Sequence, residues 1–192
     1  LLFFSRGSYA LGSQDVSKFA KGSYTGEVCA KGLKALGVQY VLIGHSERKE
    51  HFHEMGIDFK MKMENTIANG MIPIYCINET MDAYQHDKEL KQIEEQLEMI
   101  PSGTSYLIIA FEPTYLIGNE QATFDITHIE SVFLKIKDYL MERNINHSII
   151  YGGGISPDNI ELLKTINGVE GFILSSSALE KEKLEFIYNS IQ

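Results

Sequence analysis

Short apolar runs alternate with amphipathic stretches from one end of this chain to the other. The runs are rich in isoleucine, valine, leucine and tyrosine, which is typical of strands buried on both faces of a parallel sheet. The stretches between them repeat apolar residues at helical spacing, as Ile129, Val132, Phe133 and Ile136 do. The pattern predicts strands over residues 8–12, 40–44, 71–76, 106–111, 148–151 and 171–174, and helices over 25–36, 58–69, 87–99, 125–142, 156–166 and 180–191.

Every predicted strand is followed by a helix, so we expect an α/β protein whose parallel sheet is covered by helices. Two architectures fit this alternation: a doubly wound open sheet and a (β/α)₈ barrel. We find no linker, repeat or low-complexity segment, and residues 1–192 are interpreted as one domain. Polar or glycine residues follow the predicted strands, at the end where barrel active sites lie. They are Gln14, His45, Asn78, Glu79, Glu112, 152–154 and 175–177.

Charge and composition exclude several classes of binding partner and location. The formal net charge is −9, which argues against nucleic acid and anionic membranes as partners. No apolar run approaches the ~20 residues that a membrane-spanning helix needs. The two cysteines, Cys29 and Cys76, are too few for a disulfide framework and favour reduced thiols. These features predict a cytoplasmic globular protein.

Two titratable side chains end predicted strands. His45 follows the run over 40–44, and Glu112 follows the run over 106–111 and precedes Pro113. If the sheet closes, the two can face each other across one site, as an electrophile and a base. Glu47 is a further polar candidate close to His45, although a structural ion pair with a lysine or arginine explains it equally well.

Three loops are candidates for holding or enclosing a ligand. Residues 152–154 are glycines before a helix capped by Ser156, where backbone N–H groups can hold an anion, or where the chain makes a plain tight turn. Residues 175–177 are serines after the last predicted strand, in a place where barrels often bind phosphate; simple helix capping is the alternative. Residues 113–118 form either a closing lid or an ordinary loop.

The sequence gives no sign of a cofactor or metal. It has neither a dinucleotide fingerprint nor a Walker motif. His51 and His53 lack a third ligand at suitable spacing, and residues 48–54 are interpreted as a solvated turn. The remaining histidines are expected on exposed, charged stretches: His86, His128 and His147.

Residues 44–48 (GHSER) together with 111–118 (FEPTYLIG) closely resemble the triosephosphate isomerase family. Further matches occur in the family's order and spacing. The resemblance implies a (β/α)₈ barrel and a cofactor-free isomerase of glycolysis and gluconeogenesis that interconverts D-glyceraldehyde 3-phosphate and dihydroxyacetone phosphate. The additional matching segments are 12–15, 22–27, 76–79 and 149–153.

The resemblance also assigns roles. It implies that Glu112 is the base that shuttles a proton and that His45 is a neutral imidazole that polarises the substrate carbonyl, with Ser46 and Glu47 in support. Residues 113–122 match the family's closing lid. The positions that match the family's substrate phosphate site are Gly118, Gly154, Ser175 and Ser176.

The same resemblance implies a homodimer, because family members insert the loop that matches Tyr24-Thr25-Gly26 into the neighbouring subunit. The chain also departs from the family. It has Gly154 where the family has serine, Ser175-Ser176 where it has a glycine pair, and Tyr115 where tryptophan is usual.

No segment matches the family's first strand, which supplies an asparagine and a lysine to the substrate. We therefore expect the first two βα units to be missing from these 192 residues, and the chain by itself to be inactive and poorly soluble. Two rival functions remain: a non-catalytic phosphate-binding or interaction protein, and another barrel enzyme that acts on a phosphorylated sugar.

Overall fold

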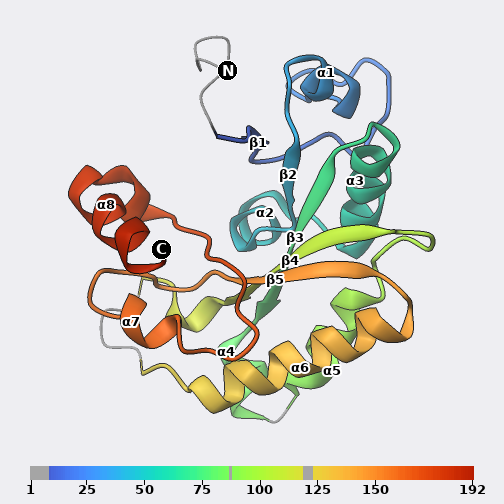
Figure 1. Cartoon of the computed structure of the whole chain (residues 1–192). Helices are drawn as coiled ribbons and strands as arrows, with labels where there is room; N and C mark the ends of the chain where they lie inside the picture. Colours follow the sequence, from blue (N-terminus) through green and yellow to red (C-terminus); the bar gives the residue numbers. More distant parts are fainter. Residues whose placement is uncertain (1–8, 87, 119–122) are drawn as a thin grey trace.

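The sheet is parallel, and its strand order decides between the two predicted architectures. The computed structural model describes residues 9–86, 88–118 and 123–192. In this part of the chain the strands pair in the order β1-β2-β3-β4-β5, each beside the next in sequence (Figure 1). This order lacks the reversal of a doubly wound sheet and agrees with a (β/α) barrel. The strands are β1 (Gly12–Ser13), β2 (Tyr40–Ile43), β3 (Ile72–Glu79), β4 (Tyr106–Pro113) and β5 (Asn146–Tyr151).

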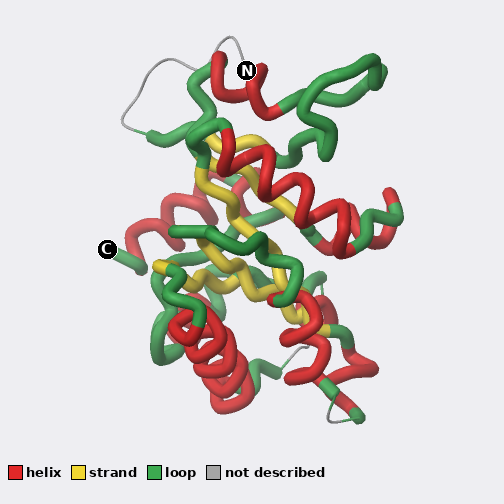
Figure 2. The backbone as a smooth tube through the Cα atoms, turned by 90° about the vertical axis from the view of Figure 1, so that its right-hand side faces the viewer, coloured by secondary structure: helices red, strands yellow, loops and turns green. Residues whose placement is uncertain are grey.

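Helices lie around the strands, which run through the middle of the molecule (Figure 2). Amphipathic stretches form α3, α5 and α6, which pack against β2, β3 and β5. The described helices are α1 (Ala30–Ala35), α2 (Ser46–Phe52), α3 (Gly56–Ala68), α4 (Met81–Gln85), α5 (Glu89–Leu97), α6 (Ile126–Glu142), α7 (Ile160–Leu163) and α8 (Lys181–Ser190), with short 3₁₀ helices η1 (Thr114–Leu116) and η2 (Ser176–Leu179).

In β3 and β4, buried residues alternate with half-buried ones at the start of the strand, and every residue is buried toward the carboxyl end. In β4, Leu107 and Ile109 are fully buried, whereas Ile108 between them is half-buried. From Ala110 onward every residue of β4 is buried, and β3 changes in the same way from Tyr75. The two strands thus carry their last residues, including polar ones, into an enclosed region that becomes the candidate site.

Several predicted elements differ from the structure. The predicted strand over 171–174 is reduced to one bridge, between Phe172 and Tyr151. The helix predicted from residue 25 begins only at Ala30, because Gly26 has a φ of 95° and breaks the helical path. Residues 48–54, interpreted as a solvated turn, instead belong mostly to α2.

The helix predicted to start at Ser156 starts later, at Ile160. The side chain of Asn159 accepts a hydrogen bond from the Ser156 N–H (2.9 Å) and donates one to the Gly154 carbonyl (2.7 Å). These local bonds satisfy the backbone in a turn and delay the helix. The first residue of the strand predicted over 8–12, residue 87 of a predicted helix and residues 119–122 of the predicted lid lie outside the described residues.

An ionic cluster around the buried Lys62 side chain joins the loop after β1 to α2 and α3. The Lys62 ammonium lies 2.6 Å from Asp15 and 2.5 Å from Glu54, and its side chain is 3% exposed. The Arg48 guanidinium contacts the same two carboxylates, at 3.1 and 2.5 Å. Because each cation contacts both carboxylates, the cluster holds the loop after β1 against α2 and α3.

Replacing Lys62 with methionine is expected to lower the free energy of unfolding by about 3 kcal/mol, the lower end of the range for a broken buried pair, because it leaves two partly buried carboxylates with one cation instead of two. Urea denaturation measures this. The control is Lys31→Met, which removes the same charge from an exposed position on α1. Equal midpoints for the two variants would contradict a structural role for the cluster.

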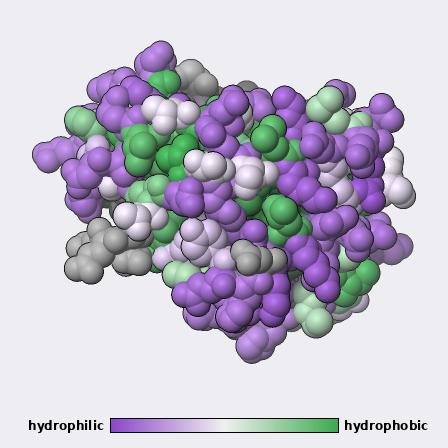
Figure 3. All heavy atoms as spheres, turned by 90° about the horizontal axis from the view of Figure 1, so that it is seen from below, coloured by the Kyte–Doolittle hydropathy of each residue, from purple (hydrophilic) through white to green (hydrophobic). Residues whose placement is uncertain are grey.

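The outer surface is mixed. Viewed from below, hydrophilic side chains cover most of the molecule, with apolar side chains exposed between them (Figure 3). Among the described residues, no helix combines the length and apolarity that crossing a membrane requires.

Candidate active site

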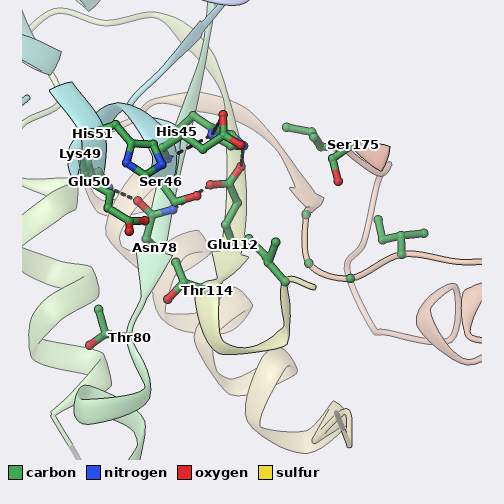
Figure 4. Close-up of a pocket in the computed structure, with 17 residues that line it drawn as sticks. His45, Ser46, Lys49, Glu50, His51, Asn78, Thr80, Glu112, Thr114 and Ser175 are labelled. Carbon is green, nitrogen blue, oxygen red and sulfur yellow. Dashed lines mark hydrogen bonds and ion pairs between the residues drawn. The ribbon is translucent and has the colours of Figure 1, made fainter. Parts of the chain in front are cut away.

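Glu112 lies near the end of β4, in a pocket of about 670 Å³ that is lined from five of the predicted strand ends or the loops after them. Its side chain is 2% exposed. Asn78 is its partner in the β3–β4 register and donates a hydrogen bond to Glu112 Oε2 (2.7 Å). The carboxylate predicted from the sequence is therefore fixed by the neighbouring strand, with its second oxygen, Oε1, turned toward His45 (Figure 4).

His45 enters the same pocket from the turn between β2 and α2. The turn needs Gly44, whose φ is +78° and whose added Cβ would approach the Cys76 carbonyl to 3.3 Å. The Glu47 N–H donates to His45 Nδ1 (3.3 Å), so His45 caps α2. In the neutral ring this bond places the proton on Nε2, which lies 3.6 Å from Glu112 Oε1. His45 thus presents an N–H donor to the pocket beside the carboxylate.

Burial raises the pKa of Glu112, because the ionised form loses its water. Several neighbours act in the opposite direction and favour the carboxylate. The charge of His45 when protonated, hydrogen bonds from the Cys76 thiol and from Asn78, and the charge of Lys49 all lower the pKa. Desolvation is the larger effect, so Glu112 is a stronger base than an exposed glutamate.

The sequence analysis gave no role in the site to Lys49, and it named Asn78 only as one of the polar residues that follow predicted strands. Lys49 was placed in a turn, but it lies on α2, and its ammonium reaches Asn78 Oδ1. The sequence held one signal for Asn78: it ends a buried strand, as Glu112 does. Nothing in the spacing indicated Lys49, because its place depends on how α2 packs over β3.

The residues predicted to hold phosphate separate into two groups. Gly154 and Ser175 line the pocket, whereas Gly118 and Ser176 are exposed and do not belong to its lining. Gly118 directly follows Ile117, which does line it. The loops after β5 and after the Phe172 bridge thus both contribute to the pocket lining.

Gly154 is required by the path of η1, which forms the first part of the predicted lid and is called the hinge below. Its φ is +58°, and a Cβ there would lie 2.5 Å from the carbonyl oxygen of Leu116 in η1. A side chain at this position and the observed path of η1 exclude each other. This chain has glycine where the family has serine, and η1 approaches that glycine too closely for a side chain to fit.

Replacing Gly154 with serine should lower the free energy of unfolding by more than the roughly 1–3 kcal/mol of a strained backbone alone. The control is Gly103→Ser, where φ is +80° but no atom lies within 4 Å of an added Cβ. Denaturation of both variants separates backbone strain from the clash with Leu116. Equal decreases in the free energy of unfolding would mean that η1 moves away from the serine side chain without destabilising the protein.

A second polar cluster lies next to the hinge and overturns the prediction that His128 is exposed. Glu79 is fully buried at the end of β3 and accepts hydrogen bonds from Tyr115 Oη (2.9 Å) and His128 Nε2 (2.7 Å). The bond to Glu79 raises the pKa of His128. Tyr84 stacks on Tyr115, with ring centroids 5.1 Å apart. Because Tyr115 stands in η1, this cluster anchors the first part of the predicted lid.

The supporting residues and the dimer loop take different places. Ser46 and Glu47 both line the pocket, and Glu47 Oε2 lies 3.8 Å from His45 Nδ1. The loop that contains Tyr24 is exposed and distant from the pocket lining, and the Tyr24 ring stacks on Phe19 with centroids 3.8 Å apart.

Comparison with known proteins agrees with this geometry. The family model described as triosephosphate isomerase matches residues 4–191. The triosephosphate isomerase of Orientia tsutsugamushi (strain Ikeda) is 35% identical over 192 residues, which cover 96% of this chain and 77% of the relative. That of Mesomycoplasma hyorhinis is 35% identical and covers 88% and 69%, and that of Gloeobacter violaceus is 32% identical and covers 98% and 78%. The chain therefore belongs to the triosephosphate isomerase family.

Proposed function

We propose that this protein interconverts D-glyceraldehyde 3-phosphate and dihydroxyacetone phosphate. One observation carries the proposal: in a member of this family, Glu112 Oε1 and His45 Nε2 lie 3.6 Å apart in one pocket. A carboxylate and an N–H donor at this separation can reach neighbouring atoms of one small substrate. That is the arrangement needed to move a proton next to a carbonyl group.

In the proposed reaction, Glu112 removes a proton from the carbon beside the substrate carbonyl. The electron pair moves toward the carbonyl oxygen, and the developing oxyanion accepts a hydrogen bond from His45 Nε2–H. The oxyanion takes up a proton and the hydroxyl group on the neighbouring carbon gives one up, a transfer that His45 Nε2 can relay. Glu112 then returns its proton to the adjacent carbon, which converts aldose to ketose. The raised pKa of Glu112 favours the first step, because a carboxylate that has lost its water is a stronger base.

The phosphate group of the substrate would lie between the loops that carry Gly154 and Ser175, with Gly118 and Ser176 added when the lid closes. Backbone N–H groups are suited to an anion in a protein whose net charge is −9. Closure would exclude water from the reactive intermediate. The Ser175 and Ser176 side chains either crowd the phosphate or donate to it, and both outcomes are compatible with their exposure.

The direct test is an isomerase assay in both directions, on the protein as its gene encodes it, in deuterated water. Proton shuttling by one base predicts deuterium on the carbon beside the product carbonyl, detected by NMR. Because the proposed proton transfers use only Glu112 and His45, a chelator should not change the rate. A folded protein that binds inorganic phosphate but converts neither triose phosphate would instead support the rival function, a non-catalytic phosphate-binding protein.

We further propose that the protein works in the cytoplasm as a homodimer. The loop around Tyr24 supports the homodimer, because an exposed aromatic ring, here stacked on the half-buried Phe19, is a suitable contact for a neighbouring subunit. Size-exclusion chromatography with light scattering tests the dimer. Replacing Tyr24 with serine should shift the protein toward the monomer.

A further inference from the structure

The bond from Asn78 to Glu112 belongs to a longer chain of contacts that reaches from α5 to the base. Gln96 Oε1 accepts from the Asn78 N–H (3.0 Å), and Gln96 Nε2 donates to the Asn78 carbonyl (2.8 Å). Both backbone groups of Asn78 are therefore held by one side chain from the covering helix. The Asn78 side chain is left to bridge Lys49 and Glu112 (Figure 4).

The Lys49 ammonium determines which way the Asn78 amide points. An ammonium only donates, so the amide atom that faces Lys49 has to be Oδ1. The amide N–H then faces Glu112 Oε2, where only an acceptor fits. The bond favours the ionised carboxylate, which is the stronger acceptor, and occupies one of its oxygens, while Oε1 stays turned toward His45.

Lys49 has no donor left for a substrate. Besides Asn78 Oδ1, its ammonium reaches Gln96 Oε1 (2.8 Å) and the Cys76 carbonyl (3.4 Å). These acceptors match the number of protons that an ammonium carries. Its charge therefore acts on Glu112 through Asn78 and across the pocket, and not by holding the phosphate.

We propose that Asn78 and Lys49 are positioning residues for the base, in which the Lys49 ammonium orients the Asn78 amide so that Glu112 is held ionised with Oε1 free for the substrate. The inference rests on the proposed function, because it assigns how the same base is prepared for proton transfer. A purely structural role would require only that the residues pack, whereas this role requires the donor on Asn78 and the charge on Lys49.

The proposal has consequences for the pKa of Glu112 and for the charge of Lys49. Losing the Asn78 donor or the Lys49 charge removes effects that lower the pKa of Glu112, so that pKa should rise further. Burial lowers the pKa of Lys49 to about 8, so its charge should be lost within the alkaline range of an assay. The titratable groups around these two residues are Cys76 from β3 and four residues of α2 or its N-cap: His45, Glu47, Glu50 and His51. Gly152, which packs on the Glu112 side chain after β5, adds no titratable side chain.

Asn78→Asp is the most sensitive variant, because it keeps the shape of the side chain, removes the donor and turns a carboxylate oxygen toward Glu112 in its place. We expect kcat at pH 7 to fall about tenfold to a hundredfold and the acid limb of the kcat profile to move to higher pH. Substrate phosphate ionises identically for all variants, so differences between profiles report the protein. An unchanged kcat and acid limb in a folded Asn78→Asp protein would overturn the proposal.

The Lys49 variants test the charge and do not depend on Asn78→Asp folding. Lys49→Met should move the acid limb upward, whereas Lys49→Arg should restore the wild-type acid limb and remove the alkaline limb near pH 8, since arginine keeps its charge there. Lys91→Met, which removes an exposed lysine on α5, is the control and should leave both limbs in place. A Lys49→Met profile identical to that of the control would also overturn the proposal.

A readout without turnover separates this inference from the proposed function. The Glu112 carboxyl can be titrated by carbon NMR in protein labelled at glutamate, with Glu112→Gln used to assign the signal. Its pKa should be higher in Asn78→Asp and in Lys49→Met than in the wild type. If the wild type does not isomerise triose phosphates, the proposed function fails while this comparison still decides the positioning role: unequal pKa values support it, and equal values refute it.

Discussion

Replacing Glu112 with glutamine should lower kcat by on the order of 10³–10⁴ and, at the same time, make the protein more stable at neutral pH. The rate falls because the amide cannot take a proton, and a positioned base contributes about 10²–10⁴ in rate. Removing the carboxylate also changes the charge beside the reaction intermediate, which lowers the rate further. Glutamine has nearly the shape of the acid, and its oxygen can still accept the Asn78 donor. The fall in rate would therefore report chemistry and not a disrupted pocket.

The gain in stability follows from the sign of the pKa shift. Burial raises the pKa of Glu112 above its ordinary value of 4.5, so the folded state binds the proton more tightly than the unfolded chain does. The stability that this preference contributes is present below about pH 4.5 and is lost as the pH rises through the higher pKa of the folded state. At pH 7 the buried charge is a cost, which glutamine removes.

Thermal unfolding across pH measures this effect. The Tm difference between Glu112→Gln and the wild type should be largest near pH 7 and shrink below about pH 4.5. Glu112→Asp is the companion variant, since it keeps the charge but withdraws the base by one methylene and should cost roughly a hundredfold in kcat. A glutamine variant that keeps wild-type turnover would exclude Glu112 as the base.

The parts of the site that the sequence predicted share one property: each ends an apolar run. Glu112 and His45 could be found because a buried parallel strand is an unbroken apolar segment, and the residue that interrupts it marks the carboxyl edge of the sheet. Because these apolar segments alternate with amphipathic helical stretches, the sequence also predicted the α/β class. The order of the strands, which required coordinates, then agreed with the barrel.

The parts that were missed depend on packing between distant segments. Lys49 belongs to the site because α2 turns it over β3, and no periodicity in residues 46–52 expresses that contact. His128 was expected at the surface because its neighbours are polar, yet Glu79, 49 residues earlier, holds it. The delayed start of α7 has a local cause, the side chain of Asn159, which competes with the helix for backbone groups.

Replacing His45 with asparagine should lower kcat by about 10²–10³ while leaving thermal stability nearly unchanged. The loss is the cost of removing one oriented donor from a developing oxyanion. Asparagine is chosen because His45 also caps α2 through Nδ1, and asparagine is among the best N-cap residues. Its short side chain can keep the bond to the Glu47 N–H but cannot extend a donor to where Nε2 now lies, 3.6 Å from Glu112.

The control for this variant is His51→Asn, which alters another histidine of the pocket lining on the same helix but not one that touches Glu112. It should keep kcat within about threefold of the wild type, a margin well below the loss of an oriented donor. Steady-state kinetics in both directions, together with Tm for each protein, separate the two functions of His45. A His45→Asn protein with lowered Tm and unchanged kcat would mean that His45 serves only as a helix cap, and that another donor polarises the carbonyl.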